Sequence, residues 1–297
     1  MKVLISGATG LIATEVAKQL EARGDTAVRL VRRAPNGPNE VEWHPERGFI
    51  AEGALDGIDA VVNLAGATTG KLPWSKGYKL ELIESRLAST KTLVAAINAS
   101  ESKPKVLVSG SASGFYGDTG SRLALESDAN GKGFLAELAG RWEREAAKVD
   151  PSVRLVLVRT TMVLSRKLGA LGRIIPLVKA GIAGPLAGGK QWWAWISLTD
   201  EARAILHLID TSSATGPYNL TAPEPATCTD VVRELAQAFH RPSLLPVPAF
   251  ALRLVFGEGA DELLICNQNL NAQRLLDSGF EFTHPTLKQA MSWVAGK

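Results

Sequence analysis

The sequence predicts an α/β protein whose core is a doubly wound parallel sheet, and three observations lead to this fold class. An apolar run at residues 3–5 ends at Gly7, and a helical pattern starts just after Gly10. Strand-like apolar runs then alternate with helix-like segments through about residue 160, which is typical of parallel strands joined by right-handed crossovers. Beyond Arg159 the chain becomes rich in Gly, Leu and Trp and then mainly helical. We therefore expect a Rossmann-type sheet followed by a smaller, mainly helical C-terminal lobe.

Hydrophobic periodicity predicts the elements of the sheet in order. Strands are expected at residues 3–5, 28–31, 40–43, 59–66, 105–109 and 154–159. The first helix covers residues 11–23 and ends at Gly24, a typical residue just beyond a helix. A third helix is expected at residues 134–148. The long second helix between them is expected to bury one apolar face, made of Leu80, Ile83, Leu87, Val94 and Ile97.

The rest of the chain is expected to cover the substrate side of the sheet. A helix is expected at about residues 200–210, and a late strand of the sheet at residues 218–220. A further helix presents an apolar face, made of Val231, Val232, Leu235 and Phe239. The tail from residue 246 onward is mainly helical, with a turn at Gly279.

The composition is that of an ordinary globular protein, with 45% apolar and 21% charged residues in 297. The formal net charge of +3 is too small to indicate binding to nucleic acid or to a membrane surface. Cys228 and Cys266 are far apart and lack metal-ligand spacing, which predicts reduced thiols and no metal site. No apolar run reaches transmembrane length, and residues 1–2 leave no room for a targeting peptide before the first strand. We therefore expect a soluble, cytoplasmic protein.

The turn after the first strand predicts a dinucleotide-binding site. Gly7 allows a tight turn, and Gly10 lets the backbone approach a pyrophosphate at the helix N-terminus. Ala13 replaces the third glycine of the usual spacing and adds one methyl group between helix and strand. Glycines also serve strand-to-helix turns for backbone reasons alone, so a turn without a ligand is the alternative.

Two arginines predict which dinucleotide binds. Arg32 and Arg33 follow the second strand, where a carboxylate usually accepts a hydrogen bond from the ribose 2′-hydroxyl of NAD. Guanidinium groups instead suit a 2′-phosphate, which they bind through charge-assisted hydrogen bonds. The pair therefore predicts NADP(H), with two solvated surface arginines as the alternative.

Three motifs together carry a family resemblance. They are the opening turn, the Asn-Leu-Ala-Gly turn at residues 63–66, and Val-Ser-Gly-Ser-Ala-Ser-Gly-Phe-Tyr-Gly at residues 108–117. The chain resembles an extended short-chain dehydrogenase/reductase, specifically the atypical epimerase-like branch of predicted nucleoside-diphosphate-sugar epimerases. Further resemblance lies in the stretch from Trp74 through Ser85-Arg86, at residues 180–191, at Trp195-Ile196, and in the tail from residue 247 through 282.

The resemblance implies a set of cofactor-binding residues. Besides Gly7, it places Thr9, Gly10, Leu11 and Ile12 on the pyrophosphate, Arg32 and Arg33 on the 2′-phosphate, and Leu64 and Ala65 near adenosine. It also implies that Glu81, Arg86 and Val163 face the cofactor. Glu81 and Arg86 lie five residues apart and only partly share a helix face, so a structural surface pair is the alternative.

The expected catalytic residues are incomplete. Active members of the superfamily pair a serine with Tyr-x-x-x-Lys on the next helix, whereas residues 133–143 read Gly-Phe-Leu-Ala-Glu-Leu-Ala-Gly-Arg-Trp-Glu. Phe134 or Leu135 stands at the tyrosine position, and Leu138 or Ala139 at the lysine position. Ser111 stands at the serine position, and the lesser candidates for it are Ser109 and Ser113.

Tyr116 is the candidate substitute for the missing tyrosine, although an unassisted phenol has a pKa near ~10 and is almost fully protonated at neutral pH. Lys132 precedes the helix and could approach Tyr116, with a solvated lysine as the alternative. Glu137 and Glu143 are expected to face solvent or a neighbouring helix. Proton transfer of the usual superfamily kind is therefore not supported by the sequence.

Two other groups of residues have structural alternatives to a functional role. Trp192, Trp193 and Trp195 either wall a pocket for a planar substrate or pack in the core. The histidines lack metal-ligand spacing and are expected to be structural or surface residues; they are His44, His207, His240 and His284.

Taken together, the sequence predicts an NADP(H)-binding, epimerase-like oxidoreductase acting on a sugar nucleotide or another small polar carbonyl or hydroxyl compound. The alternative is a catalytically silent NADP(H)-binding sensor or scaffold. We divide the chain into an NADP-binding Rossmann domain at residues 1–165, with a late strand around 216–222, and a substrate-side lobe at residues 166–215 and 223–297. Within the lobe, the resemblance implies a family-specific C-terminal domain at about residues 245–293.

Overall fold

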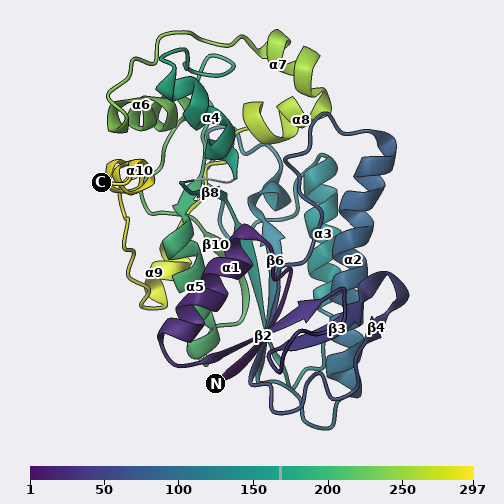
Figure 1. Cartoon of the computed structure of the whole chain (residues 1–297). Coiled ribbons are helices and arrows are strands. Elements are labelled where there is room, and N and C mark those ends of the chain that lie inside the picture. The colour runs from purple at the N-terminus through teal and green to yellow at the C-terminus, as the bar shows by residue number, and fades with distance from the viewer. Residues whose placement is uncertain (167–168) are drawn as a thin grey trace.

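The computed structural model of the chain describes residues 1–166 and 169–297 (Figure 1). Among these residues, eight strands form the main sheet in the order β10-β7-β6-β5-β1-β2-β3-β4, in which only β3 and β4 pair antiparallel. The strands are β1 (Lys2–Ser6), β2 (Thr26–Val31), β3 (Glu40–His44), β4 (Phe49–Ile50), β5 (Ala60–Asn63), β6 (Val106–Ala112), β7 (Arg154–Thr160) and β10 (Gly216–Leu220). The order of the strands reverses between β1 and β5, which makes this the topological switch point of a doubly wound sheet. The predicted fold class is confirmed.

Helices cover both faces of the sheet because successive residues of each strand point to opposite sides. Val3 and Ile5 face α1 (Leu11–Ala22) and α5 (Leu198–Asp210), whereas Leu4 lies in the core on the other face. That other face is covered by α2 (Lys76–Ala99) and α3 (Phe134–Ala146). Helix α5 belongs to the segment that we assign to the lobe, yet it packs against α1 on the sheet; the domain division itself stays a prediction.

The predicted apolar face of α2 differs from the observed one at the N-terminal end of the helix, where the prediction is wrong. Leu80 is 57% exposed, whereas Leu82 is fully buried and packs with Tyr78 and Leu138 of α3. Val94 and Ile97 are buried as expected. The burial pattern shifts along the helix because its first turns pack against α3 and its last turns pack against the sheet.

A second core lies beyond the carboxyl ends of the strands. It is built around Trp193 and Trp195 and packs α4 (Ala170–Lys179), α6 (Cys228–Ala238) and α10 (Leu287–Ala295) together. A two-stranded parallel sheet of β8 (Met162–Leu164) and β9 (Trp195–Ser197) runs through it. The other short elements are the 3₁₀ turns η1 (Pro45–Arg47) and η2 (Ser113–Tyr116), α7 (Ala249–Phe256), α8 (Glu258–Ala260), the π-helical turn η3 (Asp261–Ile265), and α9 (Gln273–Asp277). None of the helices in residues 1–166 and 169–297 has the length and hydropathy of a membrane span.

Candidate cofactor and substrate site

The turn between β1 and α1 has the geometry of an anion site. Gly7 has φ +68°, and a Cβ on it would lie 2.7 Å from the carbonyl oxygen of Leu64, so this position requires glycine. Gly10 N donates to Gly7 O at 2.7 Å, and no described side chain caps α1. The first-turn amides are therefore left for a ligand, and the helix dipole favours an anion there. Ala13 is buried in the core against β1, so the extra methyl group is accommodated.

A buried polar pair shapes the neighbouring turn after β5. Ser6 and Asn63 lie opposite each other in the sheet, and Ser6 Oγ donates to Asn63 Oδ1 at 2.7 Å. Ser6 Oγ also accepts from the backbone amides of Leu64 and Ala65, both at 3.1 Å. This arrangement fixes the Leu64–Ala65 backbone beside Gly7 at the switch point. The sequence did not single out Ser6, although a polar residue at the end of a buried strand was a usable signal.

Arg32 and Arg33 differ in their contacts. Arg33 forms a bidentate ion pair with Glu40, with both Nη–Oε distances at 2.7 Å. Arg33, and then the backbone amide of Asn36, lowers the pKa of Glu40 to about 2. Arg32 is exposed and makes no hydrogen bond or ion pair with a described residue. The pair therefore consists of one anchored guanidinium and one available guanidinium.

Arg86 lies against the turn at Gly66. Its Nη1 donates to the carbonyls of Ala67 and Leu82, at 3.0 and 3.1 Å, and a Cβ on Gly66 would lie 3.1 Å from its Cζ. Burial lowers the pKa of Arg86 to about 10, and no described carboxylate pairs with it. Glu81 is exposed and forms no ion pair with Arg86. Arg86 thus presents an uncompensated positive charge beside the switch point.

Several of the expected cofactor residues converge in space. Ile12, Leu64 and Val163 all pack at the edge of the same core cluster. Val163 lies near the start of α1, because a Cβ on Gly169 would approach both the Val163 carbonyl oxygen, at 3.3 Å, and Leu11, at 3.6 Å. Thr9 and Gly10 are exposed beside them. These residues therefore lie together along the carboxyl edge of the sheet, and their role in binding stays a prediction.

Ser111 lies in β6 and points toward α3. Its hydroxyl donates to Glu143 Oε1 at 2.6 Å. The expectation that Glu143 faces solvent or merely a neighbouring helix is wrong, because this residue is 9% exposed and its carboxylate pairs with Arg159 at 2.8 and 2.9 Å. Glu137 is exposed as expected. Ser111 is therefore hydrogen-bonded to a buried ion pair.

Tyr116 belongs to the same network. Its hydroxyl donates to Asn219 Oδ1 at 2.6 Å and accepts from Arg159 Nη1 at 2.8 Å. Burial raises the pKa of Tyr116 to about 12, although Arg159 acts in the opposite direction. Lys132 is exposed and its side chain makes no hydrogen bond or ion pair with a described residue. Arg159 thus links the two expected catalytic residues, since it contacts Tyr116 directly and Ser111 through Glu143. The sequence analysis did not predict this role for Arg159.

The start of α3 is apolar where a superfamily tyrosine and lysine would stand. Phe134 packs against Trp74, with ring centroids 5.5 Å apart. Leu138 and Ala139 are buried in two small clusters, one with α2 and one with Tyr116. No residue of α3 is tyrosine or lysine. The positions of the superfamily tyrosine and lysine therefore hold packing residues, and the one titratable side chain in the first turn of α3, Glu137, is exposed.

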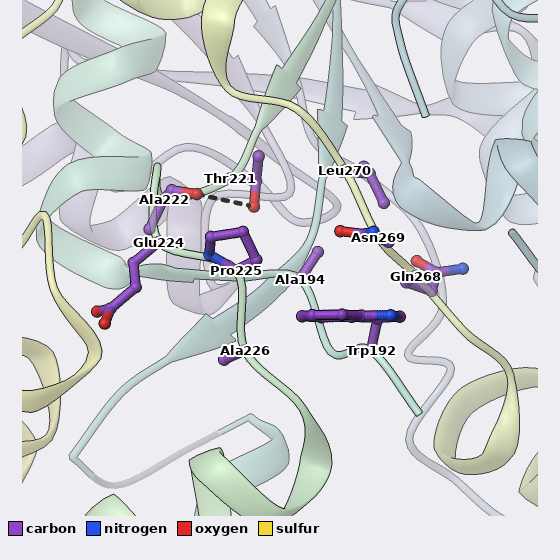
Figure 2. A pocket seen from close by; sticks show the side chains of 10 residues that line it. All are labelled: Trp192, Ala194, Thr221, Ala222, Glu224, Pro225, Ala226, Gln268, Asn269 and Leu270. Atoms are coloured by element: carbon purple, nitrogen blue, oxygen red, sulfur yellow. Dashed lines mark hydrogen bonds between the residues drawn. The ribbon is translucent and has the colours of Figure 1, made fainter. Parts of the chain in front are cut away.

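The tryptophans do not wall a large pocket. Trp193 and Trp195 are buried in the second core, so packing is their role. Trp192 is half-buried and lines a small cavity together with residues 194, 221–222, 224–226 and 268–270 (Figure 2). The cavity holds about 10 Å³, which is room for about one water molecule. It is therefore too small for a planar substrate.

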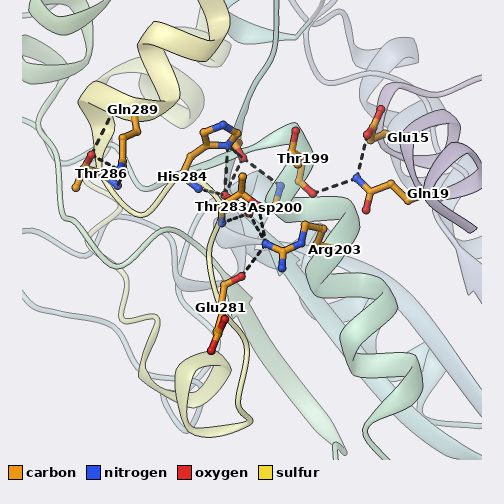
Figure 3. A network of polar contacts seen from close by, with 11 residues as sticks. Glu15, Gln19, Thr199, Asp200, Arg203, Glu281, Thr283, His284, Thr286 and Gln289 are labelled. Carbon is orange, nitrogen blue, oxygen red and sulfur yellow. Dashed lines mark hydrogen bonds and ion pairs between the residues drawn. The ribbon is translucent and has the colours of Figure 1, made fainter. Parts of the chain in front are cut away.

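A buried carboxylate joins the C-terminal segment to α5 (Figure 3). Asp200 accepts hydrogen bonds from the backbone amides of Thr283 and His284, at 2.7 and 2.9 Å, and from Ser197 Oγ at 2.9 Å. Arg203 reaches the same carboxylate at 3.3 Å. Burial lowers the pKa of His284, although Asp200 opposes this. The network is structural, as we expect for the histidines.

Comparison with known proteins agrees with this geometry. The profile of the NAD dependent epimerase/dehydratase family matches residues 3–221, and a domain of unknown function matches residues 247–294. An epimerase family protein of Mycobacterium leprae is 38% identical over 293 residues, covering 98% of this chain and 95% of the relative. The human epimerase family protein SDR39U1 is 33% identical over 302 residues, covering 99% of each chain.

Solved structures of epimerase family proteins superpose on this chain. A human SDR39U1 crystal structure with NADPH superposes with a TM-score of 0.93 at 30% identity, covering 100% of this chain and 99% of that one. A nucleoside-diphosphate sugar epimerase from Corynebacterium glutamicum gives 0.82 at 27% identity, covering 100% of this chain and 58% of that one. The fold and the site together define a protein of the NAD(P)-dependent short-chain dehydrogenase class. The chain belongs to the NAD dependent epimerase/dehydratase family, which confirms the resemblance seen in the sequence.

Proposed function

We propose that the protein binds NADP(H) in preference to NAD(H) and transfers hydride to or from a small polar carbonyl or hydroxyl compound, of which a sugar nucleotide is the leading candidate. The observation that carries the proposal is the exposed Arg32, which pairs with no described residue and lies beside Arg33 at the end of β2. When bound, NADP(H) would supply or accept the hydride. The NADPH in the human relative's structure supports the choice of cofactor.

Residues of this chain fit the parts of the cofactor. The uncapped N-terminus of α1 at Thr9–Ile12 would hold the pyrophosphate, and Leu64 and Ala65 would lie along adenosine. Arg32 would bind the 2′-phosphate, while Arg33 is held beside it by Glu40. Arg86, which lacks a described carboxylate partner, would offset further phosphate charge. A carboxylate cannot offset phosphate charge. Glu81 is therefore the least well supported of the expected cofactor-binding residues.

Replacing Arg32 with Ala is expected to weaken NADPH binding at least about tenfold, because one charge-assisted contact contributes roughly 1.5–3 kcal/mol. NADH binding should change little, because NADH has no 2′-phosphate. Titration calorimetry with both cofactors measures the two affinities. Arg33→Ala is the matched control and should have the smaller effect, because its guanidinium is already bound to Glu40. An unchanged NADPH-to-NADH ratio in Arg32→Ala would contradict the assignment.

Ser111 and Tyr116 stay our candidates for the substrate end of the site. Ser111 donates to the Glu143 carboxylate, so its proton has an acceptor although no Tyr–Lys pair is present. If the enzyme turns over NADPH against a panel of sugar nucleotides and carbonyl compounds, Ser111→Ala should abolish turnover while leaving NADPH affinity unchanged. Activity that survives this substitution would exclude Ser111.

A second candidate function is a catalytically silent NADP(H)-binding sensor or scaffold. It is favoured by the closed network around Tyr116, whose raised pKa keeps the phenol protonated at neutral pH, and by the apolar start of α3. Tight NADPH binding without turnover of any compound in the panel would support this second function.

We also propose that the binding partner is a small molecule and neither nucleic acid nor a membrane. The proposed location is the cytoplasm, which cell fractionation tests.

A further inference from the structure

The segment at residues 249–266 is thinly attached to the rest of the protein. It contains α7, α8 and η3, and Figure 1 shows it beside the first turns of α2 and α3. Within this range, all of which the structure describes, only Leu252, Gly259 and Ala260 are buried. Its large apolar side chains Phe250 and Leu254 are 71% and 85% exposed. Segments with so few buried apolar contacts are the ones that open locally at low cost.

Two carboxylates, one helical turn apart, hold this segment down. Glu258 pairs with Lys79 of α2, at 2.8 and 2.9 Å. Glu262 accepts hydrogen bonds from the first backbone amides of α3, those of Phe134 and Leu135, at 3.0 and 3.1 Å. A carboxylate is stabilised there by the helix dipole. These two carboxylates attach the middle of the segment, and its C-terminal end is anchored where the carbonyl of Leu264 accepts hydrogen bonds from Gln191 and Trp193 at the second core. Residues 249–260 have little apolar packing.

Two glycines allow the segment to approach its neighbours closely, one at Glu262 and one at Leu72. Gly133 precedes α3 with φ +111°, and a Cβ on it would lie 2.7 Å from Glu262 Oε1. A Cβ on Gly259 would lie 2.2 Å from Leu72 Cδ2, in the loop between β5 and α2. These positions allow the segment to lie directly on two separate loops.

The two loops follow β5 and β6, the strands that flank the expected substrate end. Leu72 lies a few residues beyond Leu64–Ala65, and the first turn of α3 adjoins η2, since a Cβ on Gly114 would lie 3.1 Å from Leu135 Cβ. Ligands of parallel sheets bind at the carboxyl ends of the strands, between such loops. The segment therefore contacts both loops that follow the carboxyl ends of β5 and β6.

We propose that residues 249–266 form a flap that opens to admit substrate and is latched shut by Glu258 and Glu262. This inference rests on the proposed function only in naming a substrate as what the flap admits. The flap opens when the Glu262 carboxylate leaves the start of α3, while the sheet and the second core stay folded. The domain of unknown function at residues 247–294 thereby acquires a role in access to the site.

Hydrogen exchange followed by mass spectrometry tests the latch without cofactor. Glu262→Gln removes the charge, so exchange at the first turn of α3 and across residues 249–266 should rise about tenfold or more, with β6 and β7 unchanged. Gly259→Ala should act in the same direction by wedging Leu72, without altering a charge. Glu281→Gln, on an exposed residue outside the flap, is the matched control and should have no effect.

The two variants also separate the flap from the proposed function. Unchanged exchange in both Glu262→Gln and Gly259→Ala, or an equal rise throughout the sheet, would overturn the flap. In holo protein, stopped-flow fluorescence should give NADPH dissociation about tenfold faster in Glu262→Gln, and an unchanged rate would show that the flap does not gate the cofactor. If NADPH does not bind at all, the proposed function fails alone, because the exchange result on the free protein still decides the flap.

Discussion

Replacing Arg159 with Met is expected to lower the free energy of unfolding by about 3–5 kcal/mol, the largest loss that we expect from a single substitution. The change leaves the buried Glu143 carboxylate without its guanidinium partner, and an uncompensated buried charge is strongly destabilising. Tyr116 loses its hydrogen-bond donor at the same time. Urea denaturation at pH 7, followed by circular dichroism, measures the loss.

The double variant Arg159→Met/Glu143→Leu is the control for this prediction. It removes both charges, and apolar replacements of a buried ion pair are often close to neutral. The double variant should therefore be more stable than Arg159→Met alone, which is the signature of coupling between the two sites. Additive losses, or a loss below about 1 kcal/mol in the single variant, would contradict a stabilising role for the pair.

Replacing Glu201 with Leu is expected to stabilise the protein at pH 8 by a few kcal/mol. Glu201 is fully buried at the start of α5, and Thr160 Oγ1 donates to its Oε1 at 2.7 Å. Its Oε2 has no partner among the described residues, and burial raises its pKa to about 8. An unsatisfied buried polar group is costly, and leucine removes it. Leaving Thr160 unpaired reduces the gain.

The pH dependence gives this prediction its sign. Between about pH 4.5 and 8 the unfolded state releases the Glu201 proton while the folded state keeps it, so the contribution of Glu201 to wild-type stability falls as pH rises, by about 1.4 kcal/mol per pH unit. Glu201→Leu lacks this fall. Its advantage should therefore be small near pH 4 and grow up to pH 8, as measured by urea denaturation across the range. The exposed-site control Glu281→Leu should show no such trend, and a parallel pair of curves for Glu201→Leu and wild type would refute the assignment.

The main sheet could be predicted from the sequence because its strands are buried on both faces. Such strands appear as continuous apolar runs, and the helices between them have clear apolar spacing. The short β4, β8 and β9 span two or three residues each and are too short for a detectable period. Leu80 was misplaced because α2 changes its packing partner along its length, and periodicity does not identify the partner.

The candidate site was only partly predictable, for a related reason. Gly7, Gly10 and the arginine pair carry local signals of turn geometry and charge. Glu143 lies in a helix that carries several charges, and nothing local distinguishes the buried one. One signal for a buried carboxylate was available in the sequence. Arg159 stands at the end of an otherwise apolar, buried strand, and its charge requires a counter-charge nearby. The contact between Glu262 and the start of α3 joins residues 128 positions apart in sequence, and no local pattern predicts it.

The buried Asp200 network has a consequence for how this protein can be engineered. The two family matches leave residues 222–246 between them, but the structure packs the two matched segments against each other. Asp200 draws two of its donors from the backbone of Thr283 and His284, and α10 packs on α6 in one shared core. A chain ending at residue 246 would lose both of these backbone donors to Asp200. Residues 247–294 are therefore packed as part of the same fold and cannot be removed as an independent appendage.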